Sequence, residues 1–215
     1  RNIISGNGGS GVYLATGSTG NQVQGNFIGT DATGSLAIPN TGDGVTALSV
    51  GGNTIGGTDA GAGNLISGNG QGGVALKGAG SDNNLVQGNF IGTSASGLVA
   101  LGNTLSGITI SGGNSNWIGG AATSARNVIS ANKLAGILIS TNSVGNLVQG
   151  NLIGLDVTGS IALGNATNGI TIASASSNTV GGTATGARNV ISGNGKDGIV
   201  IFGAGATGNL VHGNY

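Results

Sequence analysis

The stretch NLISGN at residues 64–69 decides the fold, because it returns almost unchanged along the chain. Close copies stand at residues 2–7 (NIISGN), 127–132 (NVISAN) and 189–194 (NVISGN), so the phrase recurs every 62 or 63 residues. A fixed period of this kind is the signature of a repeat protein, in which each unit stacks on its neighbours. The whole chain, residues 1–215, is therefore predicted to be one repeat domain.

A finer period of about 31 residues lies inside the long one. An Asn stands four residues before a Gly at seven places, and a second Asn, followed four residues later by Gly, comes after each of those glycines. The first set of asparagines is Asn7, Asn40, Asn69, Asn103, Asn132, Asn165 and Asn194, and the second is Asn21, Asn53, Asn84, Asn116, Asn146, Asn178 and Asn209.

Each unit contains three short apolar segments. One has the form GITI (residues 107–110), the next has the form NLVQG (residues 84–88), and the third is the pair of apolar residues inside phrases such as NLISGN. Short runs with a period of two, bounded by Gly, Asn and Ser, are typical of strands. Three strands per unit predict one coil of a parallel β-solenoid, with about seven coils and 21 strands in the chain.

The asparagines and the apolar residues then have structural roles. Asn and Gly suit tight corners, and Asn amides stacked from coil to coil can form hydrogen-bonded ladders. The apolar residues that alternate along the strands should point inward and stack in aliphatic columns. The predicted inward residues include Val12, Leu14, Val23, Ile28, Ile108, Ile110, Val148, Ile170, Ile172, Ile199 and Ile201.

The composition excludes several classes of protein. Glycine accounts for 49 of 215 residues without a period of three, so the chain is not collagen, and 37% hydrophobic residues argue against disorder. Six basic and six acidic residues give no net charge, which disfavours a nucleic-acid partner. No apolar run is long enough to span a bilayer. With no Cys and one His, no disulfide, thiolate or cofactor site is expected.

The repeat resembles that of right-handed parallel β-helix proteins, and the longer phrase GNFIGTDATG (residues 25–34) resembles tandem arrays in very large secreted and surface-attached bacterial proteins. The resemblance covers essentially the whole chain. It implies a right-handed solenoid and an extracellular or cell-surface location. It does not fix an activity, since lyases, hydrolases, epimerases, tailspikes and inert stalks share this scaffold.

Only six carboxylates are available for chemistry. Asp31 and Asp59 are the one pair that we expect to lie close together, because GTD at residues 29–31 and GTD at residues 57–59 are predicted to follow the same strand on adjacent coils. The pair has no Glu, His or other base beside it. We therefore expect no catalytic residue and no metal site, and treat both as weak candidates for surface binding.

Four further features of the sequence bear on whether the surface of the solenoid binds a ligand. Arg126 and Arg188 occupy the same repeat position two coils apart and form a candidate grip for an acidic glycan. Trp117 is predicted to face outward, where its ring can stack on a sugar. His212 replaces a repeated Gln and is expected to be a surface residue. Thr46, Thr109 and Thr171 form an interrupted outward column, which is a weak signal for ice binding.

The sequence thus favours a non-enzymatic structural solenoid in an extracellular or cell-surface assembly, such as a stalk, adhesin or filament-like rod. Its expected partner is itself, by end-to-end stacking or by continuation of the same array, with glycans as a further possibility. The alternatives are a polysaccharide-binding or polysaccharide-modifying β-helix and, as a minor one, an ice-binding solenoid. Neither nucleic acid nor a membrane is expected to bind.

Overall fold

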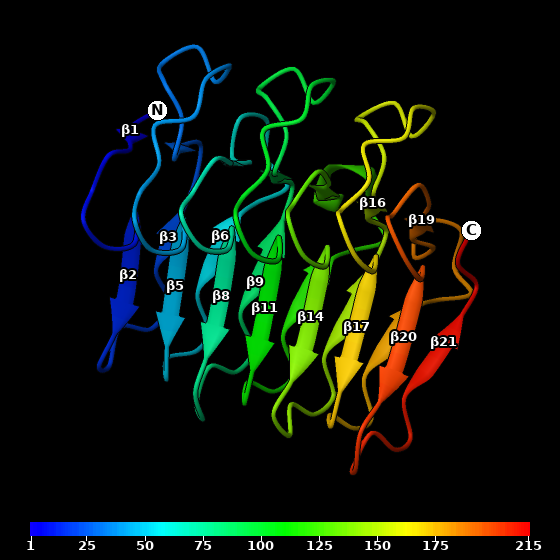
Figure 1. Cartoon of the computed structure of the whole chain (residues 1–215). Coiled ribbons are helices and arrows are strands. Elements are labelled where there is room, and N and C mark those ends of the chain that lie inside the picture. Colours follow the sequence, from blue (N-terminus) through cyan, green and yellow to red (C-terminus); the bar gives the residue numbers. More distant parts are fainter.

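The chain winds into a parallel β-solenoid with three sheets of seven strands each (Figure 1). The computed structural model describes all residues from 1 to 215. We name the sheets A, B and C in the order in which the chain visits them, and a coil is one strand of each. Within a sheet, every strand pairs in parallel with the equivalent strand of the neighbouring coil. The predicted solenoid and its 21 strands are confirmed.

Sheet A contains the shortest strands. They are β1 (Ile3–Ile4), β4 (Phe27–Ile28), β7 (Leu65–Ile66), β10 (Phe90–Ile91), β13 (Val128–Ile129), β16 (Leu152–Ile153) and β19 (Val190–Ile191). Sheet B contains the longest, which are β2 (Val12–Ala15), β5 (Val45–Leu48), β8 (Val74–Lys77), β11 (Ile108–Ser111), β14 (Ile137–Ser140), β17 (Ile170–Ala173) and β20 (Ile199–Phe202).

Sheet C completes each coil. Its strands are β3 (Gln22–Val23), β6 (Thr54–Gly56), β9 (Leu85–Gln87), β12 (Trp117–Gly119), β15 (Leu147–Gln149), β18 (Thr179–Gly181) and β21 (Leu210–His212). The one helical element is a 3₁₀ turn, η1 (Thr123–Ala125), in the loop after β12. No helix in the chain is long and apolar enough to cross a bilayer.

The core fills the space between the three sheets. It is one cluster of 23 buried residues, almost all Ile, Val or Leu, with the inward side chain of each strand directly above that of the next coil. The predicted inward residues lie in these columns, and Ile108, Ile110, Ile170 and Ile172 are completely buried. Ile201 is an exception, at 39% exposed, because β20 is the last strand of sheet B and no coil covers it.

Loop length alternates between successive coils at two corners. Between sheets A and B, every second coil carries a long loop; these loops, 29–44, 92–107 and 154–169, are called the crest loops and stand above the sheets in Figure 1. Between sheets C and A, the same coils carry the longer loops 57–64, 120–127 and 182–189, called the C–A loops.

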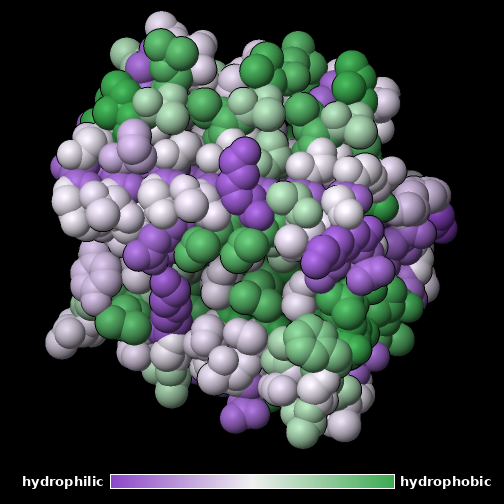
Figure 2. Space-filling model, viewed as in Figure 1, coloured by the Kyte–Doolittle hydropathy of each residue, from purple (hydrophilic) through white to green (hydrophobic).

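The crest loops contact one another although a coil lies between them. The Ala95 N–H donates to Gly34 O (2.9 Å), and the Val157 N–H donates to Gly97 O (3.0 Å). Each loop is also closed by a short antiparallel bridge, for example between Thr30 and Ala37. Apolar side chains gather along this crest, as the green patches at the top of Figure 2 show.

Candidate functional site

The first predicted set of asparagines forms a continuous ladder at the corner between sheets A and B. Each Nδ2 donates to Oδ1 of the equivalent Asn on the next coil, from Asn7 to Asn40 (2.7 Å) through to Asn165 to Asn194 (2.9 Å). The four intervening pairs are joined at 2.9 to 3.0 Å. In every pair the earlier residue along the chain is the donor.

The second predicted set forms an equivalent ladder at the corner between sheets B and C. It runs from Asn21 to Asn53 (3.0 Å) through to Asn178 to Asn209 (3.0 Å), again with the earlier residue donating. The internal members of both ladders are completely buried. The prediction of asparagine ladders is therefore confirmed for both sets.

A third ladder, at the corner between sheets C and A, was not predicted. Its amides are joined at 2.9 to 3.3 Å, and its members are Asn2, Asn26, Asn64, Asn89, Asn127, Asn151, Asn189 and Asn214. Its sequence separation alternates between about 25 and 38 residues, because every second interval contains both a crest loop and a C–A loop. The Asn at the start of NLISGN and the Asn at the end of NLVQGN were the signal that could have revealed it.

From the third coil onward, each ladder amide also binds the backbone of the preceding coil. Asn116 Nδ2 donates to Ser81 O (2.9 Å) as well as to Asn146 Oδ1 (2.9 Å), and the backbone N–H of Asn116 donates to the same Asn146 Oδ1 (2.9 Å). Buried polar groups are costly unless they are paired. The ladders meet this requirement at every internal coil, so the asparagines serve the fold rather than a ligand.

Glycine is required where the chain passes over a ladder. Gly92 has a φ of +90°, and a Cβ at this position would come within 2.1 Å of Ser130 O. Its equivalent on another coil, Gly154, has a φ of +87° and would meet Ser192 O at 2.2 Å. These positions combine left-handed backbone with close approach, which only glycine tolerates.

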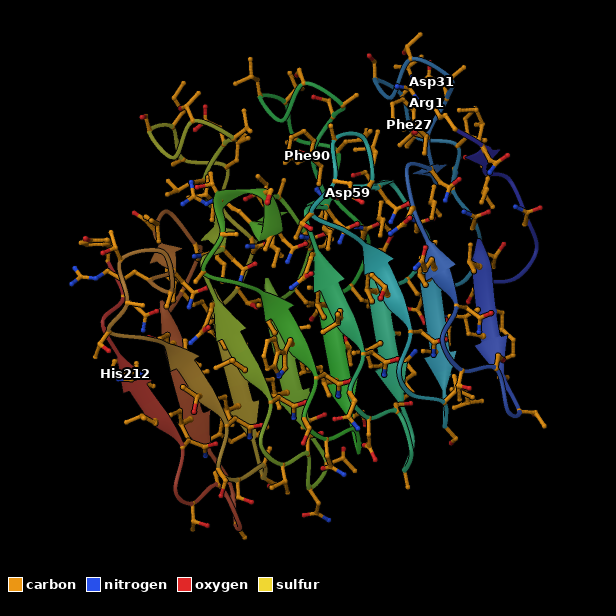
Figure 3. The ribbon with its side chains drawn as sticks, turned by 180° about the vertical axis from the view of Figure 1, so that it is seen from behind. Arg1, Phe27, Asp31, Asp59, Phe90 and His212 are labelled. Atoms are coloured by element: carbon orange, nitrogen blue, oxygen red, sulfur yellow. The ribbon has the colours of Figure 1, made fainter.

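Asp31 and Asp59 do not form a pair. The strand before Asp31 is β4 of sheet A, whereas the strand before Asp59 is β6 of sheet C, so the expectation that both follow the same strand is wrong. The similar GTD triplets misled because they stand at two different corners. Figure 3 shows Asp31 on a crest loop and Asp59 apart from it on a C–A loop.

The Asp31 carboxylate closes its own crest loop. It accepts hydrogen bonds from the Thr33 hydroxyl (2.6 Å) and from the N–H groups of Ser35 and Leu36 (2.9 and 3.0 Å). The Thr33 hydroxyl, followed by the Leu36 N–H, holds the pKa of Asp31 well below its ordinary value. The negative charge of Asp31 is therefore committed to the loop.

Asp156 has the same role in the third crest loop. Its carboxylate accepts hydrogen bonds from the Thr158 hydroxyl and from the N–H groups of Ser160 and Ile161. Burial would raise the pKa of Asp156, but the Ile161 N–H and the Thr158 hydroxyl outweigh it and hold the pKa below its ordinary value. Nowhere in the chain do three or more His or Asp side chains group as they would around a metal ion.

The arginine row lies along the C–A loops, and its guanidinium groups contact the chain itself. Arg126 Nε donates to Gly150 O (3.0 Å). The Arg188 guanidinium lies over the ring of Tyr215, with 4.9 Å from Cζ to the ring centroid, and Nη1 donates to the Tyr215 hydroxyl (2.7 Å). Both predicted glycan-binding arginines are thus half-buried and already hold partners.

Trp117 faces outward from β12 of sheet C, as predicted, and is 51% exposed. It borders a depression of about 260 Å³ that Gln87, Gln149 and Leu147 also line. The two glutamine side chains lie on either side along the rod, and each donates to a backbone carbonyl of the next coil, Gly119 O or Gly181 O (both 2.9 Å). His212 continues this glutamine column in the last coil.

The threonine column exists in the predicted register but is mostly covered. Thr46 and Thr171 are only 5% and 8% exposed. The Thr46 hydroxyl donates to Asp43 Oδ2 (3.1 Å), and Asn168 Nδ2 donates to the Thr171 hydroxyl (3.1 Å). Only Thr109 of the three stands partly open, so the column presents no flat array of free hydroxyls.

The largest cavity lies outside sheet A, between the crest loops and a C–A loop. It measures about 560 Å³, and its lining includes Arg1, Phe27, Asp59, Gly63 and Phe90. Figure 3 shows Arg1 and Phe27 together, with Phe90 and Asp59 farther along the rod. The Arg1 guanidinium lies over the Phe27 ring, with 4.4 Å from Cζ to the centroid.

Comparison of the chain with protein-family models and with curated protein sequences finds no match to either.

Proposed function

We propose that this chain is a non-enzymatic structural solenoid that acts as a rigid segment of an extracellular or cell-surface assembly, such as a stalk, adhesin or filament-like rod. One observation carries the proposal: three asparagine ladders run unbroken through all the coils. Each coil is tied to the next by amide pairs at three corners and by three parallel sheets. Such a chain resists bending at every coil.

The surface candidates also favour a structural role. The guanidinium groups of the arginine row are held by the chain, and the Asp31 carboxylate closes its loop. At a strand separation of about 4.8 Å, the seven coils form a rod roughly 30 Å long. A longer array of the same repeat would extend this distance by a constant amount per coil.

Stretching a single molecule between its two ends tests the proposal. We expect the wild-type chain to hold its length up to a distinct unfolding force, and the ladder variant Asn103→Ala to unfold at a lower one. Gradual extension at low force, as for an unfolded chain, would refute a role as a rigid structural segment. Antibodies against this chain should label intact cells of the source organism, and labelling only after permeabilisation would refute the proposed location.

We propose further that the rod is continued by coils of the same kind, from the same chain or from a second copy. Asn214 and Tyr215 already begin the next turn: Asn189 Nδ2 donates to Asn214 Oδ1 (2.9 Å), and the Tyr215 N–H donates to Asn189 O (2.9 Å). A second copy whose Asn2 extended the same ladder would have to displace these two residues.

Sedimentation at tens of micromolar tests stacking between copies. We expect a variant lacking Asn214 and Tyr215 to self-associate more strongly than the full chain, because the position they occupy is then open. Equal monomeric behaviour of both proteins would reject stacking between separate copies.

A polysaccharide-binding function is the second candidate, and the exposed Trp117 with its flanking glutamines favours it. Trp117 is the only tryptophan of the chain, so its fluorescence reports on this surface alone. Titration with a panel of neutral and acidic polysaccharides should shift its emission if sugars stack there. An unchanged spectrum at saturating sugar would reject this candidate.

A further inference from the structure

Three C–A loops and the start of the chain offer the same residue position just before a ladder asparagine. This position holds Arg1, Gly63, Arg126 and Arg188, which stand one residue before Asn2, Asn64, Asn127 and Asn189. On the following coil, the first sheet A position after the next ladder asparagine holds Phe27, Phe90, Leu152 and Tyr215, in the same order. In three of these four places, an arginine is thus paired with the first sheet A residue of the next coil.

Where the pair is Arg and an aromatic residue, the guanidinium covers the ring. This is seen for Arg1 over Phe27 (4.4 Å) and again for Arg188 over Tyr215 (4.9 Å). A guanidinium stacks favourably on an aromatic face because the ring quadrupole attracts the cation and the planar group lies flat on it. The repeat therefore contains two internal examples of one guanidinium-binding arrangement.

The Phe90 ring lacks this partner. Its equivalent arginine position is Gly63, and the cavity of about 560 Å³ lies where the guanidinium would be, with both residues in its lining. A Cβ at position 63 would come within 1.9 Å of Gly88 O, so no side chain fits there. The cation cannot come from this coil.

The charge of this corner also differs from that of the equivalent corners on other coils, because the arginine is missing and a carboxylate is present. Asp59 lines the cavity, whereas the equivalent residues of the other two C–A loops are Ala122 and Ala184. The Asp59 carboxylate is exposed and forms neither an ion pair nor a hydrogen bond within the chain. Arg1 lines the same cavity, but its guanidinium lies on Phe27, which is two strand spacings, or about 10 Å, from Phe90 along sheet A.

We propose that this cavity binds the side chain of an arginine from a partner polypeptide. The guanidinium lies flat on the Phe90 ring, and its N–H groups donate to the Asp59 carboxylate, which the fork of an arginine matches better than an ammonium group does. The occupant is inferred from the Asp59 carboxylate, which holds no cation of the chain, and from the two internal arginines that already make the first of these contacts.

The test is an NMR titration of the folded chain with N-acetyl-arginine amide, followed through the backbone amides of Gly63 and Asp59. We expect weak, saturable binding in the millimolar range, because a single stacked ion pair supplies little free energy. The citrulline analogue, which has the same shape without the charge, should not bind measurably, and the lysine analogue should bind more weakly than arginine.

Two variants with precedents inside the chain separate binding from folding. Phe90→Leu copies Leu152, and Asp59→Ala copies Ala122, so both should fold, as their circular dichroism will show. Each should weaken arginine binding by about twofold to fivefold. Asp197→Asn, which removes an exposed carboxylate in the last coil, is the matched control and should leave binding unchanged.

Equal binding of the citrulline or the lysine analogue would overturn the proposal, as would unchanged affinity in both pocket variants. Shifts that spread over Asp82 and Asp197 as strongly as over Asp59 would show non-specific attraction to carboxylates and would overturn it too. None of these outcomes depends on whether the solenoid is a structural rod.

Discussion

Replacing Asn103 by Ala breaks the first ladder at its middle. The Asn103 Oδ1 atom accepts from the backbone N–H and from Nδ2 of Asn69 (3.0 and 2.9 Å), and its Nδ2 donates to Ile66 O and to Asn132 Oδ1 (both 3.0 Å). The substitution removes all four hydrogen bonds in a place that no solvent reaches, since Asn103 is completely buried.

The consequences for the four partners differ. The Asn69 backbone N–H has no other acceptor, so it becomes a buried donor without a partner, which costs about 1–3 kcal/mol. The other three partners keep a second hydrogen bond: Asn69 Nδ2 to Ile28 O, Ile66 O from the Gly92 N–H, and Asn132 Oδ1 from the residue 103 N–H. Each of these losses costs about 0.5–1 kcal/mol, so the total is about 2.5–6 kcal/mol.

Equilibrium unfolding in urea, followed by circular dichroism, measures this loss. The matched control is Asn7→Ala at the first coil of the same ladder, where only the 2.7 Å bond to Asn40 is lost and no buried group is left without a partner. The control should cost about 1 kcal/mol or less. If the two variants differ by less than about 1 kcal/mol, the ladder does not stabilise the solenoid in the way described.

Substitutions at three more positions, two of them paired with a control variant, test other parts of the fold in the same assay. Asp43→Ala should lower the free energy of unfolding by about 2–4 kcal/mol, because the buried carboxylate accepts from the Gly72 N–H and from Lys77 Nζ (2.7 Å). Lys77→Ala, at a half-exposed position, should lower it by about 1 kcal/mol. Gly92→Ala should lower the urea midpoint strongly and Gly9→Ala should not, since a Cβ at Gly9 meets nothing; equal midpoints would refute the close-approach argument. The lowered pKa of Asp156 contributes stability that is complete above the unfolded-state pKa of about 4 and is lost as the pH falls below it. Asp156→Asn should therefore flatten the pH dependence of the free energy of unfolding in acid. An unchanged slope would contradict this.

The repeat made the fold predictable because each structural position has its own residue type. Gly-Ile-x-Ile marks sheet B and Asn-x-Val-x-Gly marks sheet C, so strand count and two of the ladders followed from spacing alone. The third ladder escaped because every second interval between its members contains both a crest loop and a C–A loop, so Asn26 follows Asn2 closely whereas Asn64 stands much farther on. A constant period is visible in a sequence, whereas an alternating one is hidden by the insertions.

The candidate site was less predictable, because short motifs do not state which corner they occupy. The two GTD triplets around Asp31 and Asp59 look alike but stand after different sheets. The break in the arginine row at Gly63 was visible in the sequence. That it leaves the Phe90 ring uncovered beside Asp59 required the register between coils, which brings together residues far apart along the chain.

In all three ladders the earlier asparagine donates to the later one, and this gives the rod a polarity. At the first coil, the Oδ1 atoms of Asn7 and Asn21 accept nothing, while at the last coil Nδ2 of Asn209 donates only to a backbone carbonyl. The aligned amide dipoles add along the axis, as peptide dipoles do in an α-helix, so one face is acceptor-rich and the other donor-rich. Two like faces would oppose oxygen to oxygen or N–H to N–H. Stacking of two copies through these faces would therefore have to be head-to-tail, which is the heterologous contact of an open filament rather than that of a closed two-fold dimer.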